Sequence, residues 1–146
     1  MIETALAAAE TALRHRFERP VTERLAPYLG TLFDDASLNF EAGFRAAGLV
    51  RGGVVEPLER LSDGTREQIA ILVRLAFGRL LAETGHPAPV ILDDALVYAD
   101  DRRIRRLFRA LEAAAAAHQV IVLTCRTAVF ADLAGHRVSV APWRGG

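Results

Sequence analysis

The chain has 146 residues, about half of them hydrophobic, and no net charge. This length supports one domain with a real core, spanning residues 1–146, and is short for two. All 18 basic residues are arginines and are balanced by 18 acids, so no general attraction to a polyanion is expected. Because the sequence contains no lysine, it also lacks the residue that a phosphate-binding P-loop requires.

The cysteine count and the hydropathy restrict the chemistry and the location. Cys125 is the single cysteine, which excludes an internal disulfide framework and a clustered thiolate metal site. No apolar stretch approaches the length of a membrane span, and the first residues lack the basic start and apolar core of a signal peptide. We therefore expect a soluble, cytoplasmic protein that makes no membrane contact.

The first part of the chain predicts helices followed by short strands. In residues 1–35, apolar positions recur at helical spacing from Ile2 to Phe17 and, after Pro20, from Val21 to Leu32. This fits two helices or one kinked helix, and favours ordinary packing helices over the returning end of a coiled coil, because too few heptads are present. Residues 36–60 hold short apolar runs separated by glycines, which predicts short antiparallel strands with tight turns.

Residues 61–146 predict alternating helices and strands. We expect a helix over residues 65–82 that is stopped at Gly85, and a buried strand at 90–92. A second helix is predicted over 101–117 with Asp101 as its cap, then a buried strand at 120–123 and a third strand at 137–141. Strand, helix and strand with continuous apolar strands imply a right-handed crossover in a parallel sheet covered on both faces, and hence an α/β fold.

The turn before the first of these helices reads Leu61-Ser62-Asp63-Gly64-Thr65. A glycine-containing turn that opens a helix presents backbone N–H groups and a hydroxyl at the positive end of the helix dipole, which suits an oxyanion. The alternative is structural: Ser62 or Thr65 is an N-cap, and Thr65 forms a capping box with Gln68. Taken alone, the loop favours the structural interpretation.

Asp93 and Asp94 come directly after the apolar strand at 90–92. Ligands bind at the carboxyl ends of strands in open parallel sheets, where one carboxylate can hold Mg²⁺ and its neighbour can orient an attacking water. The alternative is a strand end that meets solvent, with Asp94 capping the next segment of the chain. Adjacent carboxylates repel unless a cation or proton intervenes, which favours a functional pair.

Three further polar residues are expected near this edge. Asp100 lies six residues after Asp94 and either reaches a partner subunit or only starts a helix. Thr124 and Arg126 follow shortly after the strand at 120–123. The arginine can meet a phosphate or pair with Asp93 or Asp94.

Taken in chain order, this loop, helix, acidic strand end, second helix and second strand resemble the C-terminal lobe of the ABC-type ATPase heads of the SMC, Rad50 and RecN group. These heads are P-loop NTPases. The resemblance is closest to the YhaN-type ATPases, whose signature reads like residues 61–68, and it covers residues 57–126. It implies that Leu61, Ser62, Asp63, Gly64 and Thr65 form the signature loop. In that family the loop donates its serine and backbone N–H groups to the γ-phosphate of ATP bound on the opposite subunit.

The resemblance also implies roles for the acidic strand end. Asp93 would be the Walker B aspartate that holds Mg²⁺, and Asp94 would replace the glutamate that polarises water. The shorter reach of Asp94 implies slow hydrolysis or mainly structural nucleotide switching. Asp100 would be the D-loop aspartate, and Arg126 would replace the switch histidine, where it can stabilise charge but cannot shuttle a proton at neutral pH.

The implied function is a partial ATPase head in a protein of DNA repair or chromosome maintenance. ATP and Mg²⁺ would bind only after a P-loop lobe completes the site in trans or the chain self-associates, and a nuclease partner and DNA would be engaged through the full complex. The alternative is a non-catalytic remnant or interaction module of the same fold. A transporter-type half is disfavoured by the direct run from Ser62 into a long helix.

Overall fold

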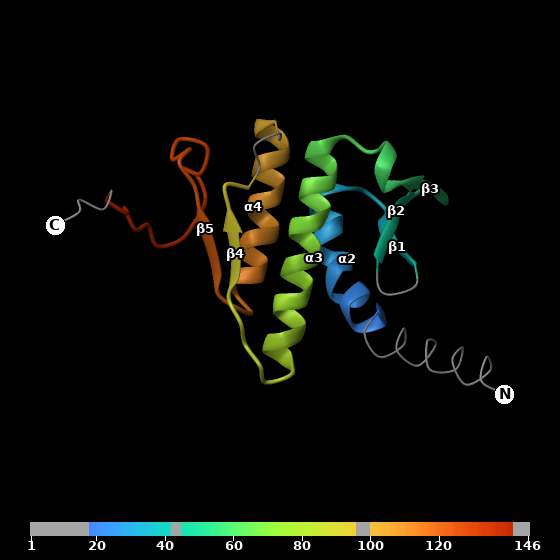
Figure 1. Ribbon diagram of the computed structural model, residues 1–146, viewed down its shortest axis with the longest axis horizontal. Coiled ribbons are helices and arrows are strands. Elements are labelled where there is room, and N and C mark those ends of the chain that lie inside the picture. The colour runs from blue at the N-terminus through green and yellow to red at the C-terminus, as the bar shows by residue number, and fades with distance from the viewer. Residues whose placement is uncertain (1–17, 42–44, 96–99, 142–146) are drawn as a thin grey trace.

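The computed structural model describes residues 18–41, 45–95 and 100–141, and the helix predicted from Ile2 to Phe17 lies outside them. Figure 1 shows helix α3 near the middle, with α2 and an antiparallel sheet on one side and α4 with a parallel strand pair on the other. The elements in chain order are α2 (Arg19–Leu32), β1 (Ala36–Glu41), β2 (Arg45–Arg51), β3 (Val54–Pro57), the short 3-10 helix η2 (Leu58–Arg60), α3 (Asp63–Glu83), β4 (Val90–Asp93), α4 (Asp101–Ala115) and β5 (Val120–Leu123). The α/β class is confirmed.

Strands β1, β2 and β3 pair antiparallel in that order, which confirms the expectation for residues 36–60. Gly52 and Gly53 turn the chain between β2 and β3 with φ of 54° and 77°, which glycine adopts without steric cost. Gly48 is required for another reason, because a Cβ there would lie 2.8 Å from the carbonyl oxygen of Glu56 on the paired strand. The sheet buries the cross-strand pair of Leu38 and Leu49 in the core.

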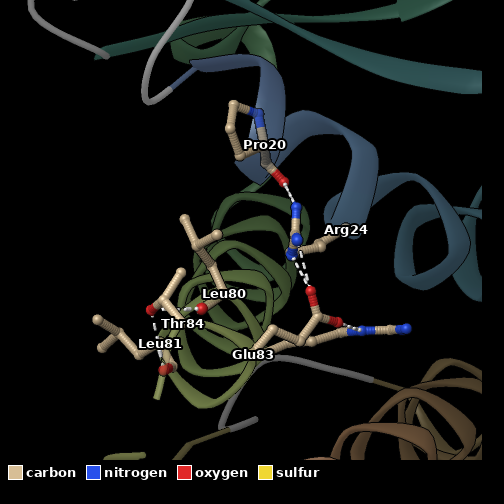
Figure 2. A network of polar contacts seen from close by, with 7 residues as sticks. Pro20, Arg24, Leu80, Leu81, Glu83 and Thr84 are labelled. Carbon is tan, nitrogen blue, oxygen red and sulfur yellow. Dashed lines mark hydrogen bonds and ion pairs between the residues drawn. The ribbon is translucent and has the colours of Figure 1, made fainter. Parts of the chain in front are cut away.

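Helix α2 packs along α3 through Val21, Leu25 and Leu29, which are fully buried. Polar contacts join the start of α2 to the end of α3 (Figure 2). Arg24 donates from Nε to Glu83 over 2.7 Å and from Nη1 to the carbonyl oxygen of Pro20 over 2.7 Å, and Arg79 donates to Glu83 over 2.8 Å. The hydrogen bonds from Arg79 and Arg24 hold the pKa of the Glu83 carboxyl below its ordinary value.

The two long helices differ in how they are buried. Helix α3 lies between layers and buries residues around much of its circumference, including Ile69, Ile71 and Leu72. Its predicted stop is confirmed: Gly85 has φ of 82°, and the N–H of His86 donates to the carbonyl oxygen of Leu81 over 2.9 Å.

Helix α4 buries one apolar face, formed by Ile104, Leu107 and Leu111. It ends at Ala115, slightly before the predicted end at residue 117. Its cap is Asp100 and not Asp101, because the Asp100 carboxylate accepts the N–H of Arg103 over 2.8 Å. The predicted cap was therefore wrong by one residue.

Strands β4 and β5 are parallel, in register from Val90 with Val120 to Asp93 with Leu123, and α4 connects them. The expectation that both faces are covered is wrong for the described part of the chain. Val90 and Leu92 point into the core, whereas Ile91 is 54% exposed and Leu123 is 45% exposed. Alternation places successive residues on opposite faces, and within the described residues only one face is packed.

The strand predicted at residues 137–141 is also wrong, since this segment has no regular secondary structure. Val138 and Val140, which carried the prediction, are largely exposed. A strand forms by pairing, and among the described residues the parallel sheet consists of β4 and β5 alone. In the part of the chain that the structure describes, no helix has the length and apolar character needed to cross a membrane.

Candidate functional site

Four element ends converge at one end of the molecule. Figure 1 shows that α3 and α4 begin, and β4 and β5 finish, at the upper end of the view. The parallel pairing of β4 and β5 places their carboxyl ends side by side, and the two helices start at the same end of the molecule. The sequence-predicted site residues are carried by these four ends.

The loop at residues 61–65 is organised as a helix start. Leu61 is buried and anchors it, and Ser62 is the N-cap of α3: its Oγ accepts the N–H of Thr65 at 3.3 Å and lies 2.9 Å from the Thr65 hydroxyl. Asp63 is exposed and pairs with Arg66 one turn later. Of the capping alternatives, Ser62 is therefore correct, and the Thr65 with Gln68 capping box is wrong because Thr65 already lies inside the helix.

This geometry leaves backbone N–H donors at the start of α3 without a partner inside the helix. The N–H groups of Asp63 and Gly64 belong to the first turn, whose donors have no partner within a helix, and they lie at the positive end of the dipole. The Ser62 hydroxyl shares its hydrogen bonds with Thr65, so it can serve a ligand only by rearranging or by donating its own proton. The cap and a bound anion would therefore share the Ser62 hydroxyl.

Asp93 and Asp94 lie at the carboxyl end of β4, and both are exposed. The N–H of Asp94 donates to the carbonyl oxygen of Leu123 over 2.9 Å, which extends the parallel ladder by one bond. Asp94 then turns the chain with φ of 45°, a left-handed conformation that is uncommon outside glycine. Non-glycine residues in such conformations cluster at functional sites, where the surrounding structure holds them.

The end of β5 lies against this acidic turn. The Cys125 thiol contacts the Asp94 carboxylate at 3.7 Å, and the backbone N–H of Arg126 donates to the Thr124 hydroxyl over 3.0 Å. The structure therefore brings the residues after both strands together, as the sequence predicted. Two carboxylates with open positions suit Mg²⁺, which takes one or two carboxylates and completes its shell with water and phosphate oxygens.

Arg103 joins the two helix starts and was not identified from the sequence. Its Nη1 donates to the Thr65 hydroxyl over 3.2 Å, and its Nε lies 3.6 Å from the Asp100 carboxylate. A signal was present, because an arginine three residues after an acidic cap lies over that cap. Its link to Thr65, however, depends on the packing of α3 against α4.

A polar pocket of about 400 Å³ opens beside the loop at residues 61–65. Asp34 and Glu56 supply its acids, and the buried Gln68 forms part of its wall. Its arginines come from β2, η2 and α4: Arg51, Arg60, Arg102, Arg103 and Arg106. Three of these arginines come from α4, and only the packing of the helix shows that they line a pocket.

Comparison with curated proteins identifies long relatives. No protein-family model matches the chain. Uncharacterized protein Rv1278 of Mycobacterium tuberculosis and Uncharacterized protein Mb1309 of Mycobacterium bovis are each 29% identical to it over 145 residues. The match covers 96% of this chain and 16% of each relative, so the chain spans about one sixth of their length.

Comparison with solved structures identifies the fold. A chain from work on ATP-driven dimerization and DNA-stimulated activation of SMC ATPases matches with a TM-score of 0.67 and 21% identity, over 94% of this chain and 85% of that one. The SMC head domain from Thermotoga maritima matches at 0.59 and 22%, over 77% and 40%. An SMC head bound to the C-winged helix domain of ScpA matches at 0.61 and 19%, over 84% and 39%. The chain therefore has the fold of an SMC ATPase head lobe.

Proposed function

We propose that the chain is the C-terminal lobe of an SMC-like ATPase head and contributes the signature loop and the Walker B carboxylates to a composite Mg-ATP site. The observation that carries this proposal is the convergence of the starts of α3 and α4 with the ends of β4 and β5, in a fold shared with SMC heads. The YhaN-type subgroup, the role in DNA repair or chromosome maintenance, and a nuclease partner are finer parts of the same proposal.

The proposed chemistry is phosphoryl transfer by positioning and charge neutralisation. Asp93 would hold Mg²⁺ and Asp94 would orient water, since both carboxylates are open to solvent at the end of a parallel strand. Ser62 and the first N–H groups of α3 would meet the γ-phosphate of a nucleotide held by the opposite subunit. Asp100 would take the D-loop position, and Arg126 would supply positive charge.

A P-loop lobe would have a place to bind. In the described residues the parallel sheet has two strands, so both strands keep a free edge, and one face presents Ile91 and Leu123 to solvent. A free edge and an apolar face are what a neighbouring lobe would extend and cover. This supports a composite site and not an independent ATPase.

Reconstitution tests the proposal. The 146-residue chain would be mixed with a purified polypeptide that carries the P-loop lobe of an SMC-type head, and co-elution and Mg-ATP turnover would be measured. We expect both to appear, and we expect Ser62→Arg and Asp93→Asn each to abolish turnover while the chain remains folded. Retained turnover in Asp93→Asn would reject the metal assignment, and an absence of both association and turnover would reject the composite site.

A non-catalytic interaction module is the second candidate. It is favoured by one observation: the Ser62 hydroxyl is already engaged in capping through Thr65. In this case the same mixture would co-elute without turnover. Co-elution measured together with turnover therefore separates the two candidates.

A further inference from the structure

The pocket beside residues 61–65 contains a buried amide that nothing in the described chain satisfies. Gln68 is 1% exposed, and among the described residues neither its Nε2 nor its Oε1 has a hydrogen-bond partner. Leaving a buried polar group unpaired is costly, and native proteins seldom do so without a ligand or water at the site. Gln68 belongs to the lining of the pocket, so a molecule that enters the pocket and reaches this amide would satisfy it.

The rim of this pocket is strongly positive. Five arginines line it against two acids, and Glu56 is already paired with Arg51. Arg60 and Arg102 have no ion pair or hydrogen bond among the described residues. Each guanidinium carries five donors in a planar fork that matches a phosphate, and arginines that outnumber the acids around them are stabilised by an anion.

The shape of the site favours a small ligand over a nucleic-acid strand. A volume of about 400 Å³ lies within the range of small-molecule pockets. Nucleic-acid strands instead occupy extended grooves with stacking aromatic side chains. A group that satisfies Gln68 has to enter the hollow, whereas a backbone phosphate on a duplex would stay at the rim.

We propose that this pocket binds a phosphate-bearing small molecule, with its phosphate oxygens held by Arg60 and Arg102 and a hydrogen-bonding group at Gln68. Leu61, Ser62 and Thr65 also line this pocket, so the site adjoins the γ-phosphate contact proposed for Ser62 and differs from it in using Arg60, Arg102 and Gln68. It uses side chains from η2, α3 and α4 of one chain and needs neither Mg²⁺ nor a P-loop lobe. Failure of the ATPase proposal would therefore leave it standing.

Binding of inorganic tripolyphosphate to the isolated 146-residue chain, without Mg²⁺, tests the site by calorimetry and thermal shift. Arg60→Gln and Arg102→Gln should each weaken binding at least about tenfold, because each removes a charge-assisted contact. Arg105→Gln and Arg109→Gln are the matched controls, since they remove the same charge from α4 outside the pocket. They should change affinity less than about twofold.

Gln68→Met gives a second, independent measurement. It should raise the melting temperature of the free chain, because it removes an unpaired buried amide, and it should weaken tripolyphosphate binding. A lower melting temperature with unchanged affinity would show that the amide serves the fold and would overturn the proposal. Equal losses in the control variants would overturn it as non-specific attraction, as would an absence of binding at millimolar ligand. Binding of a single-stranded oligonucleotide in preference to tripolyphosphate would replace it with a nucleic-acid site.

Discussion

Arg103 donates a hydrogen bond from Nη1 to the Oγ1 of Thr65 over 3.2 Å, across 38 residues of sequence. The same arginine lies 3.6 Å from Asp100, whose carboxylate accepts the Arg103 N–H. Two positions that the proposed function assigns to nucleotide binding are thus joined by a third side chain. We therefore expect a substitution at the start of α4 to alter the hydrogen bonding at the start of α3.

A double-mutant cycle measures this link. Arg103→Gln and Thr65→Val should each destabilise the chain, and together they should cost less than the sum by about 0.5–1 kcal/mol, because the second change removes a bond that is already broken. Urea unfolding provides the free energies. Arg105→Gln replaces Arg103→Gln in the control cycle, and coupling of the same size there would show that the effect is not local to the hydrogen bond.

The two helix caps can be tested with matched variants. Asp100→Ala should destabilise the chain by about 1 kcal/mol, whereas Asp100→Asn should retain most of the stability because asparagine caps about as well. Ser62→Ala should cost about the same as Asp100→Ala. Thermal unfolding of the three variants and the wild type measures these losses of stability. Equal losses for the alanine and asparagine variants at Asp100 would mean that the ion pair with Arg103, and not the cap, supplies the stability.

Glycines in two helices should respond oppositely to alanine. A Cβ at Gly78 would lie 2.6 Å from His118 Nε2 and from Val90 Cγ2, both part of a packed region, whereas a Cβ at Gly30 would meet nothing within 4 Å. Gly30→Ala should stabilise by about 0.5–1 kcal/mol through helix propensity. At Gly78 the same gain is outweighed by overpacking, which costs about 1–3 kcal/mol. Urea midpoints that rise in both variants would contradict the packing around His118.

The sequence predicts local elements well, for physical reasons visible in particular residues. Ser62 is one of the two caps that the sequence left open, and together with Gly85 it bounds α3, because caps act within one turn. The acids after β4 and the polar residues after β5 meet because parallel strands end at one edge. These inferences need only periodicity and chain order.

The features that could not be predicted depend on tertiary packing. Arg103 reaches Thr65, and Arg51 and Arg106 line one pocket, only because α3, α4 and β2 pack together. Gln68 appears as an ordinary helix residue until its burial is known. Val138 and Val140 have strand propensity, but pairing depends on a neighbour that the local pattern does not specify.

His118 should make stability depend on pH. It is 6% exposed, and among the described residues neither ring nitrogen has a hydrogen-bond partner. Burial, with a smaller contribution from Arg79, lowers the pKa of its imidazole below the ordinary value. The unfolded chain therefore takes up a proton near pH 6.5 while the folded chain still resists it.

The direction of the pH effect depends on that difference in pKa. Above about pH 7.5, one unit over the ordinary pKa, the ring is almost entirely neutral in both states and contributes little pH dependence. As the pH falls from there toward the lower folded pKa, the unfolded state binds more protons and the free energy of unfolding decreases, by at most about 1.4 kcal/mol per pH unit. Urea unfolding of the wild type and of His118→Leu, measured from about pH 7.5 downward, isolates this contribution as the difference between the two curves. The variant should lose less stability on acidification, and parallel curves would show that the His118 ring is protonated as readily in the folded chain as in the unfolded one.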